Sequence, residues 1–184
     1  MKSNKITDKR PEALQDHHMP KSYDISLKAY GGGGTAKSLN PKPKKLKHQS
    51  MKRFEDQYKN IIDYIVRITY QIWEEKNIVY IYDTYSKDCR VWDEFGLQSG
   101  SEKIVADTVH TNNAFPDIRL FADEVIWAGE ENASFHTSHR TIITGTNTGF
   151  SKFSKPTGKK VRLFCIANCV AKNNEIYYEN VVYD

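Results

Sequence analysis

The chain has 184 residues, and 39% of them are hydrophobic, which is enough for one domain with an apolar core. Its net charge of +4 is unevenly distributed: residues 1–53 hold 13 Lys or Arg and 4 Asp or Glu, whereas residues 54–184 hold 14 and 19. The sequence contains no apolar run of the length that a signal peptide or a membrane-spanning helix needs. We therefore expect a cytoplasmic protein without a membrane partner.

Residues 1–53 are predicted to form a basic, disordered tail. They contain a glycine run at 31–34 and a lysine-rich run at 41–47, but few large apolar side chains. Such a segment cannot offset an ordering entropy of about 1–2 kcal/mol per residue. The lysines could attract phosphate groups, but no aromatic side chains that could stack on bases are interleaved in the lysine-rich run. We therefore favour a solvated tail and expect no nucleic-acid partner.

The folded part, residues 54–184, is predicted to begin with helices. Apolar side chains recur with helical spacing from Phe54 to Trp73, which indicates a long amphipathic helix. Ser101 is a suitable N-cap for another helix. After the first helix we predict, in order, a shorter helix over 77–86, a strand over 89–94, a loop over 95–100 and a helix from Ser101 to about Asn113.

Long strands follow the helices. Segments 118–127, 133–145, 161–171 and 175–184 alternate or are rich in apolar residues, and turn-rich runs separate them. Consecutive strands joined by turns favour an antiparallel pairing. Helices gathered on one side of a strongly curved antiparallel or mixed sheet form an α+β cone. We therefore expect a cone with an internal cavity.

The last strand carries mixed chemistry on one face. Side chains alternate across a strand, so one face should carry Ile176, Tyr178, Asn180, Val182 and Asp184. An aromatic, an amide and a carboxylate among apolar residues suit the wall of a cavity, and we place this face there. By the same alternation His136 and Arg140 share one face of segment 133–145, and His139 lies on the other.

Metal binding is not expected. The three cysteines form an odd set without secretory features, which favours a reducing compartment over a disulfide framework. Cys165 and Cys169 share a strand face, but four residues of strand separate them by roughly 13 Å. His136 and His139 face opposite ways. Neither pair suits one zinc ion.

Several short motifs follow one another along residues 54–184. They are Ile72-Trp73-Glu74-Glu75, Tyr85-x-x-Asp88-Cys89, Ala114-Phe115-Pro116-Asp117, Val125-Ile126-Trp127, Ser138-His139-Arg140, Gly145-Thr146-Asn147-Thr148-Gly149, Pro156-Thr157-Gly158-Lys159-Lys160-Val161 and the closing Glu179-x4-Asp184. In this order they resemble the SnoaL-like polyketide cyclase family of the nuclear transport factor 2-like superfamily. The resemblance implies a cone-shaped fold and, typically, a cofactor-free aldol closure by acid–base chemistry. It also implies a homodimer, for which Phe164, Ile166 and Val170 offer apolar surface.

The resemblance also implies an acid/base residue. The family's late strand reads Glu, then His or Glu, then Trp, three variable positions and the acid/base Asp. This pattern places the aspartate at Asp184 and puts Asn180 where the family has Trp. Asn147 stands where the family has His. The family continues beyond the aspartate with a Gly-Leu-rich segment, so we expect the domain to be truncated at Asp184.

The expected reaction needs a base with a raised pKa, and an apolar cavity raises a carboxyl pKa by desolvating the charged form. Asp184 is the expected acid/base, and Arg140 or His136 would stabilise the enolate oxygen. The expected contacts to a small hydrophobic carbonyl compound are Tyr178, Asn180, Trp92 and His139. In the structural alternative, Arg140 pairs with a carboxylate of the sheet and the aromatic residues only pack. The functional alternative is a ligand-binding or dimerisation module without turnover.

Overall fold

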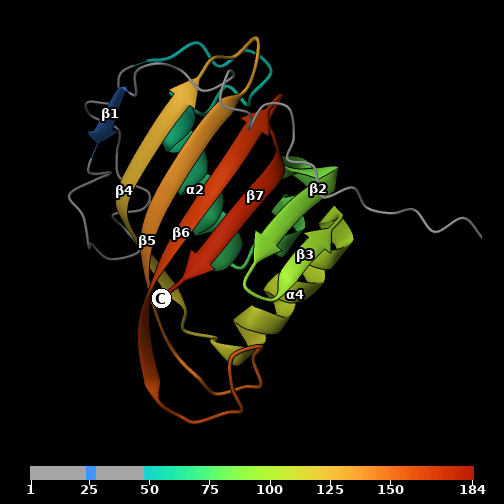
Figure 1. The fold of residues 1–184 in the computed structure, drawn as a ribbon, viewed down its shortest axis with the longest axis vertical. Helices are drawn as coiled ribbons and strands as arrows, with labels where there is room; N and C mark the ends of the chain where they lie inside the picture. Colours follow the sequence, from blue (N-terminus) through green and yellow to red (C-terminus); the bar gives the residue numbers. More distant parts are fainter. Residues whose placement is uncertain (1–23, 28–47) are drawn as a thin grey trace, which may run out of the picture.

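The protein is an α+β structure in which helices cover one face of a mixed sheet (Figure 1). The computed structural model describes residues 24–27 and 48–184. The elements are β1 (Asp24–Leu27), α2 (Ile61–Trp73), the 3-10 helix η4 (Ile78–Tyr80), α3 (Ile81–Thr84), β2 (Tyr85–Asp93), β3 (Gly96–Ser99), α4 (Ser101–Ala114), β4 (Arg119–Gly129), β5 (Phe135–Thr146), β6 (Lys160–Lys172) and β7 (Glu175–Tyr183). The predicted fold class is confirmed.

The sheet has the order β1-β4-β5-β6-β7-β2-β3. Strands β4 to β7 pair antiparallel with their neighbours in chain order, as predicted from the turns between them. The pair β2–β7 is parallel, because the chain crosses over from β2 through α4 and three long strands before it returns. The sheet is therefore mixed, and β7 lies between β6 and β2 near its centre.

The first long helix is shorter than its apolar pattern predicts. Asn60 has extended backbone, and its side chain accepts a hydrogen bond of 2.9 Å from the backbone N–H of Asp63, so it caps α2. Phe54 and Tyr58 continue the helical spacing but lie before this cap. Both rings pack edge-on against Tyr64, with centroids 4.9 and 5.1 Å away. Their spacing therefore reflects a shared core and not a longer helix.

The expected loop at 95–100 contains strand β3. A short turn joins it to β2, with Asp93 opposite Gly96, and the Asp93 carboxylate accepts a 2.8 Å bond from the Phe95 N–H. Gly96 has a φ of 113°, which a glycine adopts without strain. The N-cap position of α4 is occupied by Gly100 and not by Ser101, and no side chain caps the start of the helix.

Helix α2 lies across the middle of the sheet and connects two apolar clusters. One cluster takes Ile61, Ile65, Ile68 and Ile72 from α2, and the other takes Ile62 and Val66. Burying a large aliphatic side chain stabilises a fold by about 1.5–3 kcal/mol. Helix α2 therefore joins the two clusters into one core against the sheet.

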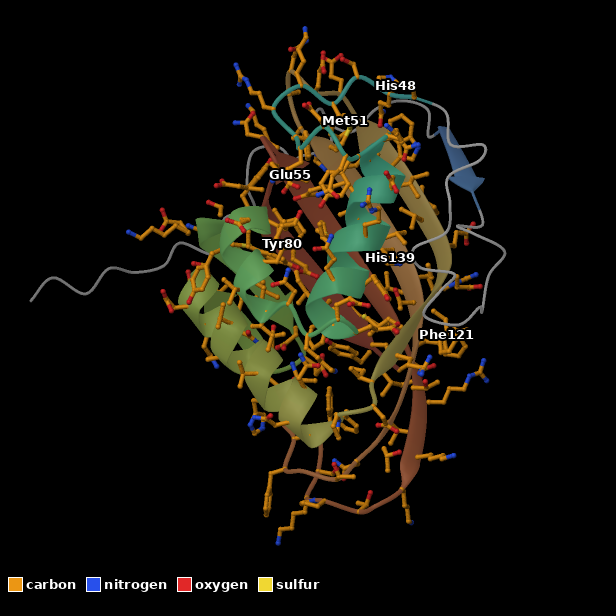
Figure 2. All side chains as sticks on the ribbon, turned by 180° about the vertical axis from the view of Figure 1, so that it is seen from behind. His48, Met51, Glu55, Tyr80, Phe121 and His139 are labelled. Atoms are coloured by element: carbon orange, nitrogen blue, oxygen red, sulfur yellow. The ribbon has the colours of Figure 1, made fainter. Side chains whose placement is uncertain are left out.

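Residues 48–53 already contact the folded domain, so the predicted boundary at 53/54 falls inside a packed segment. The Gln49 side chain accepts a 3.1 Å bond from the Ile61 N–H, and Ser50 Oγ donates to Glu131 at 2.6 Å. Met51 packs against the core near the start of α2 (Figure 2). Residues 24–27 of the predicted tail form strand β1, which pairs with β4, so the prediction is wrong for them. The other residues of the tail, 1–23 and 28–47, lie outside the described residues. Within the described part, none of the helices has the length and apolar character to span a bilayer.

Candidate functional site

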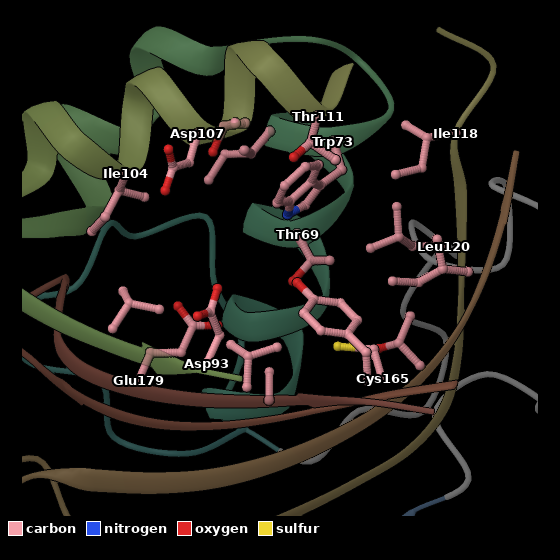
Figure 3. A pocket seen from close by; sticks show the side chains of 18 of the residues that line it. Thr69, Trp73, Asp93, Ile104, Asp107, Thr111, Ile118, Leu120, Cys165 and Glu179 are labelled. Atoms are coloured by element: carbon pink, nitrogen blue, oxygen red, sulfur yellow. The ribbon is translucent and has the colours of Figure 1, made fainter. Parts of the chain in front are cut away.

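A pocket of about 160 Å³ lies between the helices and the sheet (Figure 3). Its walls come from α2, α4 and the inner faces of β5, β6 and β7. Most of the lining is apolar, with Ile65 and Ile72 of α2, Ile104 of α4 and Leu163 of β6 as examples. An apolar cavity of similar size in another protein holds a single benzene ring. The pocket is therefore suited to a small ligand.

The residues of β7 that line the pocket are Ile176, Glu179, Val181 and Tyr183. The predicted cavity face, with Tyr178, Asn180 and Asp184, is therefore wrong for this end of the strand. Regular alternation from Ile176 predicts that face, but the β6–β7 pairing is irregular at this point. Ala171 pairs with Ile176, and the preceding residue of β6, Val170, pairs with Tyr178, so β7 has one extra residue between the two pairs. This irregularity reverses the faces, because one slipped residue turns every later side chain to the other side.

Glu179 is the carboxyl group that β7 directs into the pocket (Figure 3). Burial among apolar groups raises its pKa to about 7, although hydrogen bonds from Tyr85 and Cys169 act in the opposite direction. The Tyr85 hydroxyl donates to Glu179 Oε2 at 3.0 Å. Cys169 lies directly opposite on β6. Glu179 is thus oriented, surrounded by apolar groups, and balanced between its two protonation states near neutral pH.

A second charged group lies where the loop between β5 and β6 meets the pocket. Lys152 pairs with Asp93, whose side chain is only 3% exposed. The Lys152 ammonium also lies over the rings of Phe95, Phe153 and Tyr183, at 5.0, 5.5 and 5.5 Å from their centroids. Cation–π attraction of this kind holds a charged amine in partly apolar surroundings.

His139 is the one sequence-predicted site residue that lines the pocket. Its side chain is 2% exposed, and its Nε2 has no hydrogen-bond partner among residues 24–27 and 48–184. Burial lowers its pKa to about 4, so the imidazole is neutral at neutral pH. A neutral imidazole can donate or accept a hydrogen bond, and the predicted contact to a ligand stays a prediction.

Asp184 and Arg140 do come together, but on the opposite face of the sheet. They line a shallow depression there with Asp123, Phe164, Ile166, Val182 and Tyr183. Arg140 pairs with Asp123 and with Glu124, whose carboxylate lies 3.4 Å from Nη2. The alternative in which Arg140 pairs with sheet carboxylates is therefore the correct one. The expected position of Asp184 in the interior is wrong.

The other predicted site residues do not line the pocket either. His136 is buried, with Nε2 3.3 Å from Ser134 Oγ. Tyr178 is buried opposite Val170 of β6. Trp92 and Asn180 are neighbours across the parallel β2–β7 pair, and the pocket takes Val91 and Asp93 from the other face of β2. These four residues belong to the sheet's packing.

The three cysteines are buried free thiols near the pocket. Burial raises the pKa of Cys165 to about 12 and raises the pKa of Cys169 well above its ordinary value, so both stay protonated and weakly nucleophilic. Among the described residues, no three His, Cys, Asp or Glu side chains lie close enough to hold a metal ion. Sequence reasoning missed Glu179, although the family pattern has His or Glu at its position.

Comparison with known proteins gives structural relatives only: no family model and no curated protein matches the chain. A SnoaL-like polyketide cyclase from Agrobacterium tumefaciens has a TM-score of 0.55 at 14% identity over 66% of this chain and 89% of that one. A candidate polyketide cyclase from Acidithiobacillus ferrooxidans also has a TM-score of 0.55, with 15% identity over 67% of this chain and 87% of that one. AclR, a candidate hydroxylase from Streptomyces galilaeus, has a TM-score of 0.50, with 21% identity over 61% of this chain and 80% of that one. The chain therefore has the nuclear transport factor 2-like fold that the sequence resemblance implied.

Proposed function

We propose that this protein, which has the fold of the SnoaL-like polyketide cyclases, binds a small hydrophobic carbonyl compound and moves a proton on it with Glu179. One observation carries the proposal. Glu179 is a pocket-facing carboxyl group whose pKa is raised to about 7 by burial and whose orientation is fixed by the Tyr85 hydroxyl. A general base is most effective when its pKa lies near the working pH.

The proton transfer follows from this arrangement. The carboxylate of Glu179 takes a proton from the carbon next to the carbonyl, the electron pair of the broken C–H bond forms a C=C bond, and the π pair of the carbonyl moves to its oxygen to give an enolate. In an isomerisation the protonated Glu179 then returns the proton to another carbon of the conjugated system. In an aldol closure the enolate carbon forms a C–C bond with a second carbonyl of the same compound, and Glu179 gives its proton to the resulting alkoxide. The neutral His139, which lies on β5 in the same sheet wall of the pocket, is a suitable hydrogen-bond partner for the carbonyl oxygen.

The pocket volume narrows the substrate class. A space of about 160 Å³ suits a compound of about one ring, and its apolar walls favour an uncharged carbon skeleton. The similar structures described as polyketide cyclases share only the fold with this chain, and one protein of that fold is described as a candidate hydroxylase. We therefore propose cyclic ketones and 1,3-diketones as the first compounds to test.

Filling the pocket should weaken the binding of any ligand. Ala167 lies on the pocket face of β6, so Ala167→Phe should reduce the affinity for any bound ketone by at least about tenfold. Asn168 is exposed on the opposite face, and Asn168→Phe adds the same ring outside the pocket as a matched control. NMR titration of each variant with the ketone panel measures the dissociation constants. Equal affinity in the two variants, or no binding by the wild type, would contradict the proposal.

The outer face of the sheet favours self-association, and we propose a homodimer through it. Phe164, Ile166 and Val182 are 41%, 40% and 57% exposed there, and exposed apolar clusters often mark interfaces. Val170, expected to join this surface, is buried. Sedimentation velocity should give a dimer mass, and a monomer at high concentration would contradict it. The expected cytoplasmic location stays a prediction.

A further inference from the structure

The neutral His139 can donate a hydrogen bond to a ligand oxygen, but it carries no positive charge to balance a negative one. Proton removal from a carbon next to a carbonyl leaves an anionic oxygen, and such an oxygen needs a positioned donor. Arg140, the expected partner, lies on the outer face. Three of the pocket-lining side chains are carboxyl groups: Asp93, Asp107 and Glu179. Within the described part of the chain, Lys152 is the only Lys or Arg that lines the pocket.

We infer that Lys152 is the ligand-binding cation of the pocket, which holds an anionic oxygen, carboxylate or enolate, of the bound compound. The inference rests on the proposed function of the pocket and names the feature of the ligand that this site recognises. It makes small acidic or enolisable carbonyl compounds the preferred class.

The loop that carries Lys152 is built to hold this side chain in place. Ser151 and Ser154 close a tight turn around it, with a 2.9 Å bond from the Ser151 N–H to the Ser154 carbonyl. The next residue, Phe153, packs edge-on against Phe95 and Tyr183, with ring centroids 5.6 and 5.5 Å away. The aromatic rings thus fix the loop to the β2–β3 hairpin and to the end of β7. Lys152 lies at their centre.

Asp93 pairs with Lys152, but this ion pair does not use up the hydrogen-bonding capacity of the lysine ammonium group. An ammonium group has three N–H donors, so it can contact Asp93 and a ligand oxygen together. Asp93 has further partners of its own, the Phe95 N–H at 2.8 Å and the Gln98 amide at 2.9 Å. A ligand oxygen can therefore take one donor of Lys152 without leaving the buried Asp93 unsatisfied.

The test compares two probes of nearly equal shape, benzoate and benzamide, which differ in charge. At about pH 6 Glu179 is mostly protonated and does not repel benzoate, given its pKa of about 7. Lys152→Met should weaken benzoate binding by about tenfold and leave benzamide binding unchanged, because it removes one charge-assisted hydrogen bond. Lys152→Arg should retain most of the benzoate affinity. The matched control is Lys155→Met, which removes an exposed lysine of the same loop and should change nothing.

A second variant gives the opposite effect, which misfolding cannot produce. Asp93→Asn keeps acceptor and shape but removes the competing charge, so benzoate affinity should rise by about tenfold and benzamide affinity should not. Equal benzoate affinity in wild type, Lys152→Met and Asp93→Asn would overturn the role of Lys152. The pocket proposal would still stand if the wild type binds benzamide and Ala167→Phe does not. Failure of both probes to bind up to their solubility would overturn both.

Discussion

Glu179→Gln should lose catalysed proton exchange by about 10²–10⁴-fold, the usual contribution of one general acid or base. Glutamine has nearly the same shape and still accepts the hydrogen bond from Tyr85, but it cannot take up a proton at neutral pH. Ligand affinity should therefore stay close to that of the wild type, and only the rate should fall. NMR in D₂O measures the rate at which a bound ketone exchanges its α-protons for deuterium.

The matched control is the same chemical change on the other face of the sheet. Asp184 lies in the outer depression, so Asp184→Asn should exchange protons at the wild-type rate. This comparison separates the pocket carboxyl from the carboxyl that the sequence alone favoured. Full exchange by Glu179→Gln, or its loss in Asp184→Asn, would show that the wrong group has been assigned.

The pH dependence of stability should change by about 3 kcal/mol when Glu179 is replaced by glutamine. The pKa of Glu179 is raised from an ordinary 4.5 to about 7, so between these values the folded protein binds more protons at this site than the unfolded chain. The contribution of Glu179 is therefore fully present below about pH 4.5 and is lost as the pH rises to about 7. Glutamine has no such dependence.

His139 acts in the opposite direction in part of the same window. Its pKa is lowered to about 4, so its contribution is lost as the pH falls below its ordinary value of 6.5. Wild-type stability alone therefore mixes two effects. Both proteins contain His139, so its contribution cancels in the difference between their unfolding free energies. Urea titrations should show this difference growing from near zero at about pH 4.5 to about 3 kcal/mol at about pH 8, with Glu179→Gln the more stable protein. A difference that does not change with pH would contradict the buried, raised carboxyl.

Local patterns in the sequence predicted much of the fold. The turn-rich runs placed the antiparallel strands β4 to β7, and the apolar repeat placed α2. The start of α2 was missed because Phe54 and Tyr58 enter the same core from irregular backbone. Strand β3 was missed because its four residues, Gly96 to Ser99, carry almost no apolar alternation. Such short edge strands form by pairing with a neighbour more than by their own propensity.

The site was harder to predict than the fold, because it depends on register and on contacts distant in the sequence. A single irregularity beside Ile176 reverses the later faces of β7, so Glu179 replaces Asp184 on the pocket wall. No pattern in the sequence predicts this register shift in the β6–β7 pairing. Lys152 lies about sixty residues along the chain from Asp93, and only the folded loop brings them together. Among the predicted site residues, His139 lines the pocket, because the side chains of β5 alternate regularly between the two faces of the sheet.

The central claim is that Glu179 faces the apolar pocket with a carboxyl group that titrates near neutral pH. The most direct measurement is an NMR titration of ¹³C-labelled glutamate side chains, in which the Glu179 signal is identified by its absence from Glu179→Gln. We predict a midpoint of about pH 7 for this signal. A midpoint near 4.5, the value of an ordinary glutamate, would show a solvated carboxylate and would contradict the proposed acid–base role.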